Sequence, residues 1–104
     1  MQKIVINVCY GGFGLSKEAT EEYARRKGLE LGNWNKNFKF YEGLSDNSIA
    51  RDDPVLVEIV ESMGSKADGW AAELKIVEIP DGVEWSVHEY DGNEWVAEAH
   101  RTWS

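Results

Sequence analysis

A glycine-rich stretch near the N-terminus has the residue types of an anion-binding loop. Gly11, Gly12 and Gly14 stand between an apolar segment and Ser16, a residue suited to cap a helix. Free backbone amides at such a helix start, together with the positive end of the helix dipole, suit a phosphate or another anion. The stretch lacks the Gly-Lys-Ser/Thr of a P-loop and the spacing of the dinucleotide fingerprint. The alternative interpretation is a tight turn in which Phe13 is a hydrophobic plug, and both stay open.

Two more side chains are candidates for the same site. Tyr10 directly precedes the glycines, and Arg51 stands just ahead of a second helix start, where its guanidinium could hold an anion. Arg51 is followed by Asp52 and Asp53, so an ion pair with a neighbouring aspartate is the competing interpretation. The predicted ligand-binding set comprises Tyr10, Gly11, Gly12, Phe13, Gly14, Ser16 and Arg51.

Histidines and carboxylates recur towards the C-terminus. The polar residues of the last two expected strands are Glu84, His88, Glu94, Glu98 and His100. Two histidines with carboxylates could hold a divalent metal. The chain has no HExxH motif or other tight ligand spacing, so we expect a solvated polar face on a hairpin and predict no metal site.

Cys9 is the one cysteine of the chain, which excludes an intramolecular disulfide and fits a reducing compartment. With His88 or His100 nearby it could act as a nucleophile. A small apolar side chain at the end of a strand is the commoner use of a lone cysteine. Because no complete nucleophile–base or acid–base set is visible, we predict no catalytic residues and no cofactor. Enzyme activity stays open, with binding preferred.

The elements that would position these residues are readable in outline. Residues 3–10 are β-branched and aromatic and predict a strand covered on both faces. Ser16 is expected to cap a helix that Gly28 ends. A second helix is expected between Asp53, as its cap, and Gly64, with a proline at its first position.

The rest of the chain is less regular at first and then rich in strands. Residues 29–53 predict loops with one short strand over Phe38, Phe40 and Tyr41, and so long a loose segment is often functional. Three strands are expected at the end of the chain: Trp70–Ile79, Val83–Glu89 and Glu94–Trp103.

The turn between the last two strands sets which side chains share a face. A two-residue turn places Trp85 beside Glu98, whereas a three-residue turn places Trp85 beside Ala97. Register follows the buried face. We therefore predict the three-residue turn, with Trp85 and Trp95 on one buried face and Gly92 in a left-handed conformation.

Length and composition bound the fold and the partners. The chain has 104 residues, 42% of them hydrophobic, which predicts one domain over residues 1–104. We expect an α+β fold in the order β-α-β-α-β-β-β, with a mixed or antiparallel sheet of four to five strands and two helices mainly on one face. The net charge of −8 disfavours nucleic acid as a partner. No apolar run approaches the ~20 residues of a bilayer span, and the first one is too short for a signal peptide.

Four segments carry a resemblance to a known family. They read KIVINVCYGGFGLSKEA, RDDPVLVEIVESMG, AELKIVEIPDGVEW and EYDGNEWVAEAHRTW, and together they resemble a family of small uncharacterised proteins encoded by bacteriophages and prophages. The resemblance covers most of the chain except residues 29–48. It implies a viral accessory protein in the cytoplasm of the host bacterium, and it supplies no catalytic residues.

Three functional hypotheses follow. The leading one is a non-enzymatic module that captures a small anionic, nucleotide-like ligand at the glycine-rich loop, in a counter-defence setting. The second is an acidic inhibitor that uses the polar hairpin face to bind a host defence, transcription or nucleic-acid-binding protein. The third is an enzyme with an unrecognised site. The expected partner is thus a small anionic ligand or a host protein, and the sequence leaves the oligomeric state open.

Overall fold

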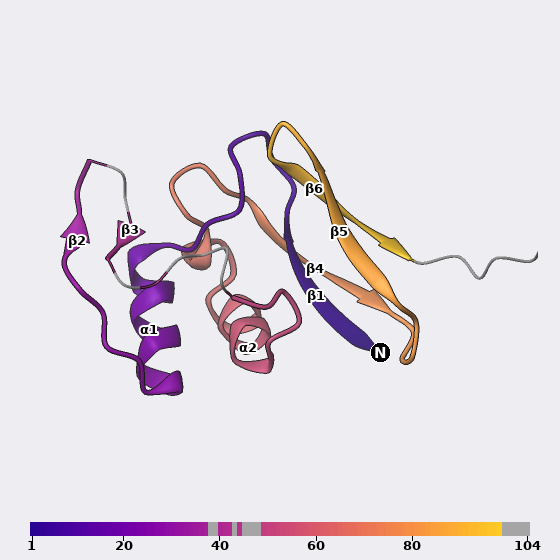
Figure 1. The fold of residues 1–104 in the computed structure, drawn as a ribbon, viewed down its shortest axis with the longest axis horizontal. Coiled ribbons are helices and arrows are strands. Elements are labelled where there is room, and N and C mark those ends of the chain that lie inside the picture. Colours follow the sequence, from indigo (N-terminus) through magenta and orange to yellow (C-terminus); the bar gives the residue numbers. More distant parts are fainter. Residues whose placement is uncertain (38–39, 43, 45–48, 99–104) are drawn as a thin grey trace, which may run out of the picture.

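A computed structural model describes residues 1–37, 40–42, 44 and 49–98 of the chain. The elements along these residues are β1 (Gln2–Asn7), α1 (Lys17–Lys27), β2 (Trp34–Asn35), β3 (Phe40–Tyr41), α2 (Pro54–Met63), the short 3-10 helix η2 (Gly64–Ala67), β4 (Leu74–Ile79), β5 (Trp85–Tyr90) and β6 (Asn93–Glu98) (Figure 1). The expected α+β class is confirmed.

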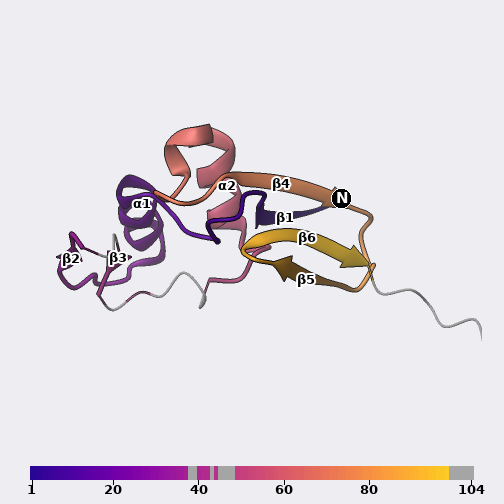
Figure 2. The same cartoon turned by 90° about the horizontal axis from the view of Figure 1, so that it is seen from above.

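The strands pair in twos rather than in one sheet of four or five. β1 pairs with β4, β2 with β3, and β5 with β6, each pair antiparallel. Figure 2 shows the β5–β6 hairpin as a layer separate from the β1–β4 ribbon. The hairpin does not extend the sheet because amides on the edge of β1 away from β4 already have other partners. The Val5 amide donates to the Arg51 carbonyl at 2.8 Å, and the Asn7 amide donates to the Glu94 carboxylate at 2.8 Å.

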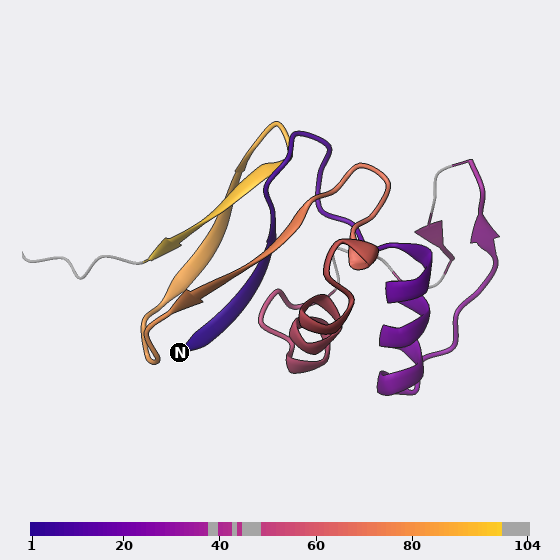
Figure 3. The ribbon, with the colours of Figure 1, turned by 180° about the vertical axis from the view of Figure 1, so that it is seen from behind.

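The two faces of the β1–β4 ribbon carry two apolar clusters. Val5 points to the side of the helices and packs in one cluster with residues of α1 and α2, including Tyr23 and Leu56. Ile4 and Ile6 point to the other side, where the hairpin packs on them. The expectation that the first strand is covered on both faces is confirmed. Seen from behind, α2 lies between α1 and the ribbon (Figure 3).

Both helices begin and end where the sequence predicts. The Ser16 hydroxyl accepts from the Ala19 amide at 3.1 Å at the start of α1, and Gly28, with φ 70°, ends that helix. The Asp53 carboxylate accepts from the Val55 amide at 2.9 Å at the start of α2. These caps satisfy amides that have no partner inside the helix.

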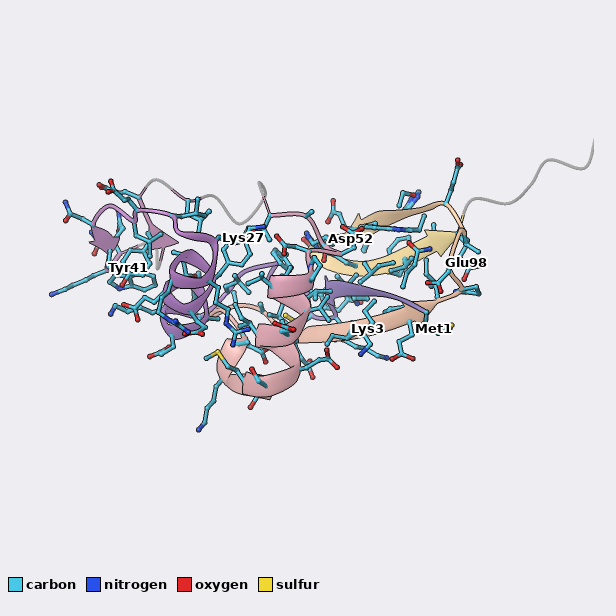
Figure 4. All side chains as sticks on the ribbon, turned by 90° about the horizontal axis from the view of Figure 1, so that it is seen from below. Met1, Lys3, Lys27, Tyr41, Asp52 and Glu98 are labelled. Atoms are coloured by element: carbon cyan, nitrogen blue, oxygen red, sulfur yellow. The ribbon has the colours of Figure 1, made fainter. Side chains whose placement is uncertain are left out.

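Asp53 also joins the two helices. The Tyr23 hydroxyl donates to Asp53 Oδ2 at 2.7 Å, and Lys27 Nζ lies 3.1 Å from the same oxygen. Burial and this hydrogen bond raise the pKa of Tyr23 to about 12. Figure 4 shows Lys27 on α1 and Tyr41 beside the same helix, where the Tyr41 hydroxyl donates to Glu21.

The hairpin register differs from the prediction. The turn has two residues, Asp91 and Gly92, with φ 52° and 89°, and Trp85 lies opposite Glu98. The predicted three-residue turn is wrong, although Gly92 is left-handed as expected. Two successive left-handed residues match the twist of a hairpin. Trp85 and Trp95 therefore lie on opposite sides of the hairpin. The prediction failed because it assumed a wholly apolar buried face, whereas Glu94 lies there as a hydrogen-bonded carboxylate.

Several strand boundaries differ as well: the first strand is Gln2–Asn7 rather than residues 3–10, and β5 runs from Trp85 to Tyr90 rather than from Val83 to Glu89. The strand expected from Trp70 begins only at Leu74, whose amide donates to Asp68 Oδ1 at 3.0 Å. β2 was not expected, while β3 falls on the expected short strand, whose Phe38 lies outside the described residues. The last expected strand reaches Glu98, and its remaining residues lie outside the described residues.

Among the described residues, no helix combines the length and the apolar character needed to cross a lipid bilayer.

Candidate functional site

Close backbone contacts account for two glycines at the glycine-rich loop. A Cβ on Gly11 would lie 1.7 Å from the carbonyl oxygen of Ala71. A Cβ on Gly92, in the hairpin turn, would lie 2.8 Å from the Gly12 nitrogen and 3.0 Å from the Tyr10 oxygen. The loop therefore packs between the segment ahead of β4 and the tip of the hairpin, and glycine is the residue that such contacts require.

The helix start behind the loop is also covered. The Ser16 amide donates to the Ala67 carbonyl at 2.9 Å, and its hydroxyl donates to the Lys66 carbonyl at 2.6 Å. The segment around η2 thus lies against the expected anion position. Gly12 is the open member of the loop: its φ is 114°, and a Cβ there would have no neighbour within 4 Å. Tyr10 is exposed beside it.

Arg51 is committed to contacts inside the fold. Its guanidinium stacks 3.6 Å above the centroid of the Phe13 ring. It pairs in bidentate fashion with Glu94, Nη2 lying 2.8 Å from Oε2, and its Nη1 donates to the Val5 carbonyl at 3.3 Å. Only 16% of the Arg51 side chain and 9% of the Glu94 side chain are exposed. The guanidinium pairs with Glu94 rather than with Asp52 or the capping Asp53, so the predicted ion pair with a neighbouring aspartate is wrong.

Asn7 is the polar centre that sequence reasoning missed. It is fully buried, and its side-chain nitrogen donates to the carbonyls of Cys9 at 2.8 Å and Gly92 at 2.7 Å. Its Oδ1 accepts from the Glu73 amide at 2.8 Å. One amide therefore ties the glycine loop, the hairpin tip and the start of β4 together. The one available signal was a lone polar residue inside the apolar run IVINV.

The residues considered for catalysis have separate partners. The Cys9 thiol donates to the Ala71 carbonyl at 3.1 Å and to Asn7 Oδ1 at 3.3 Å. The His88 ring contacts the Ser86 hydroxyl at 3.0 Å and stacks on Trp95. His100 lies outside the described residues. Within the part of the chain that the structure describes, no three His, Cys, Asp or Glu side chains group as a metal site would need.

The outer side of the hairpin carries uncovered aromatic side chains. By the observed register, one side faces the ribbon and the other faces outward; the outward residues, called the hairpin face below, are Ser86, His88, Tyr90, Asn93, Trp95 and Ala97. Tyr90 is 73% exposed and Trp95 is 49% exposed. Trp95 and His88 are stacked, their ring centroids 6.1 Å apart. The expected polar face is thus an aromatic one, because the carboxylates of Glu94 and Glu98 belong to the other side.

Negative charge is concentrated around this hairpin. Residues 76–98 include seven acidic side chains and no lysine or arginine: Glu78, Asp81, Glu84, Glu89, Asp91, Glu94 and Glu98. All of these except Glu94 are exposed. Glu94 is paired with Arg51, and Asp81 lies 3.2 Å from the N-terminal amine, so the other five carboxylates set the field on this side of the molecule.

Comparisons with known proteins bring no assignment for this arrangement. The chain matches no protein-family model, no curated protein and no solved structure. Function therefore has to be argued from the site itself.

Proposed function

We propose that this protein is a non-enzymatic binding module that docks its β5–β6 hairpin on a basic surface of another protein. The observation that carries the proposal is the hairpin face. Tyr90 and Trp95 are exposed there, although the inner side of the same hairpin packs its apolar side chains on the core. Tyrosine and tryptophan are the residue types that most often anchor protein interfaces. Large apolar side chains gathered on one exposed face mark an interaction surface more often than scattered ones do.

The hairpin is held firmly enough to present these rings. On its inner side Trp85 packs on the ribbon and its indole donates to the Gln2 side chain at 3.2 Å. The Asn7 side chain donates to the Gly92 carbonyl and so holds the turn, and the Arg51–Glu94 ion pair holds the start of strand β6. A surface that is ordered before binding loses less entropy when the complex forms.

The charge of the region indicates the kind of partner. Residues 76–98, which form the hairpin and the chain leading into it, carry six exposed carboxylates and no lysine or arginine. Such a field speeds encounter with a basic surface and repels acidic ones. The resemblance to phage and prophage proteins makes a host defence, transcription or nucleic-acid-binding protein the expected class of target, since surfaces that bind nucleic acid are basic.

Capture of a nucleotide-like anion at the glycine-rich loop stays a prediction. The contacts favour the hairpin over it, because the Arg51 guanidinium is paired with Glu94 and the Ser16 amide is bonded to Ala67. Gly12 is the remaining open backbone position of that loop.

The test compares three immobilised proteins in a bacterial lysate: the wild type, the double variant Tyr90→Ala/Trp95→Ala, and Trp70→Ala. Trp70 is 77% exposed and lies outside the hairpin, so its variant controls for loss of an exposed ring. We expect the wild type and Trp70→Ala to retain the same basic protein, and the double variant to lose it. The purified pair should then bind in a salt-sensitive manner. An identical set of proteins on all three columns, or loss from Trp70→Ala alone, overturns the proposal.

A further inference from the structure

We infer that the hairpin face receives an arginine side chain of the partner, stacked on the ring of Trp95 or Tyr90 and paired with a carboxylate at the turn. This inference rests on the proposed function and names the chemistry by which the same face selects its target.

The chain itself repeats this chemistry elsewhere. Three aromatic rings have a cation of the same chain above them: Arg51 over Phe13 at 3.6 Å, Lys27 over Tyr23 at 5.8 Å and Lys17 over Tyr41 at 5.9 Å. Attraction between a cation and the negative face of a ring stabilises such pairs. In the Arg51 pair the guanidinium also meets a carboxylate, that of Glu94, in bidentate fashion.

The hairpin face has the rings and the carboxylates without the cation. No lysine or arginine of the described residues lies over Tyr90 or Trp95. Their register places the two rings on one face, with Tyr90 beside the turn and Trp95 opposite His88. Asp91 in the turn is exposed, and Glu89 holds the turn by accepting from the Gly92 amide at 2.8 Å. Two of the three groups that meet at Arg51, an aromatic ring and a carboxylate, are therefore present on the hairpin, and the third, the guanidinium, is missing among the described residues.

Arginine fits this face better than lysine. A guanidinium is planar, stacks on a ring while its edge pairs with a carboxylate, and is weakly hydrated. An ammonium on an exposed surface keeps its water and gains less from a ring. A second copy of this chain is a poor occupant, because two molecules of charge −8 repel each other.

The test measures fluorescence anisotropy of two labelled peptides, one with three Arg-Gly-Ser repeats and one with three Lys-Gly-Ser repeats, so that their charges are equal. We expect the wild type to bind the arginine peptide about two- to five-fold more tightly than the lysine peptide. The double variant Tyr90→Ala/Trp95→Ala should abolish this preference and leave an equal, salt-sensitive residual affinity for both peptides. Trp95→Phe should keep part of the preference, and Trp70→Ala should keep all of it.

Each other outcome is decisive. Equal binding of both peptides by the wild type overturns the arginine inference and leaves docking on a basic surface standing. Binding of neither peptide at low ionic strength overturns both proposals. A preference that survives in the double variant Tyr90→Ala/Trp95→Ala assigns the arginine to another surface and overturns the inference.

Discussion

The glycine-rich loop and the hairpin face differ in how far the fold itself uses their chemical groups. Around the loop, Arg51 meets a ring, a carboxylate and a carbonyl, and Ser16 has partners for its amide and its hydroxyl. On the hairpin face, Tyr90 and Trp95 have neither a covering element nor a cation among the described residues. The residues with the more suggestive sequence pattern thus make contacts within the fold, whereas the rings of the hairpin face do not, and this contrast supports the proposal that the hairpin binds a partner.

The largest expected effect on stability comes from removing Arg51, which lies beside the glycine-rich loop. Arg51→Ala leaves the Glu94 carboxylate buried without its partner, and we expect a loss of about 3–5 kcal/mol in the free energy of unfolding, measured by urea denaturation. The double variant Arg51→Met/Glu94→Leu should lose less than the single variant, because it leaves no unpaired charge. Equal losses in both would show that the guanidinium contributes packing on Phe13 rather than charge.

A second test concerns the close backbone contact at the glycines. Gly11→Ala should cost about 3 kcal/mol, because its Cβ would meet the Ala71 carbonyl oxygen at 1.7 Å and the backbone would have to move. Gly12→Ala is the matched control: its side chain would enter open space, and only the strain of φ 114° remains, about 1 kcal/mol. Thermal melts of the two variants should therefore differ clearly. A reversed order would mean that the loop does not pack against the segment ahead of β4.

The next effect is smaller and depends on pH. The pKa of Tyr23 is raised from its usual value near 10 to about 12 by burial and by its bond to Asp53, so the unfolded state gives up this proton first. The stability that this shift contributes is complete below pH 10 and is lost as the pH rises towards 12. Tyr23→Phe should cost about 1 kcal/mol at neutral pH and flatten this alkaline decline. Unfolding curves of both proteins at neutral and alkaline pH decide the point.

The Asp53 carboxylate of the same contact has its pKa shifted in the opposite direction, so it contributes stability that is lost in acid rather than in alkali. Burial works against the charged Asp53 carboxylate, but bonds from Tyr23, the Val55 amide and Lys27 outweigh it and keep the pKa of Asp53 below its usual value. The resulting stability is present above the usual pKa near 3.8 and is lost as the pH falls through the lowered value. Asp53→Ala should cost about 1–2 kcal/mol at pH 7 and lose less on acidification than the wild type. A wild-type-like acid decline in this variant would assign it to other carboxylates.

Local patterns in the sequence predicted the local structure. Ser16, Gly28 and Asp53 were identified correctly as helix boundaries because capping depends on residues within one turn of each other. The left-handed Gly92 was found for the same reason. Such features need no knowledge of the tertiary fold.

Contacts between distant residues were beyond those patterns. Arg51 and Glu94 lie 43 positions apart, and the sequence offered the adjacent aspartates as nearer partners. The hairpin register failed because a carboxylate on the inner face is tolerated only where a partner such as Arg51 meets it. The aromatic hairpin face was therefore missed, since it follows from that register and not from composition.

The smallest expected effect on stability tests the hairpin face directly. Trp95→Ala should change the free energy of unfolding by less than about 0.5 kcal/mol, because the ring is 49% exposed and closes no gap in the core. Trp85→Ala, on the inner side of the same hairpin, should cost about 2 kcal/mol, because that ring packs on the ribbon and bonds to Gln2. Urea denaturation of the two variants measures the contrast. A stability loss in Trp95→Ala equal to that in Trp85→Ala would make Trp95 part of the fold, and the hairpin face would no longer differ from the glycine loop in the way that supports binding.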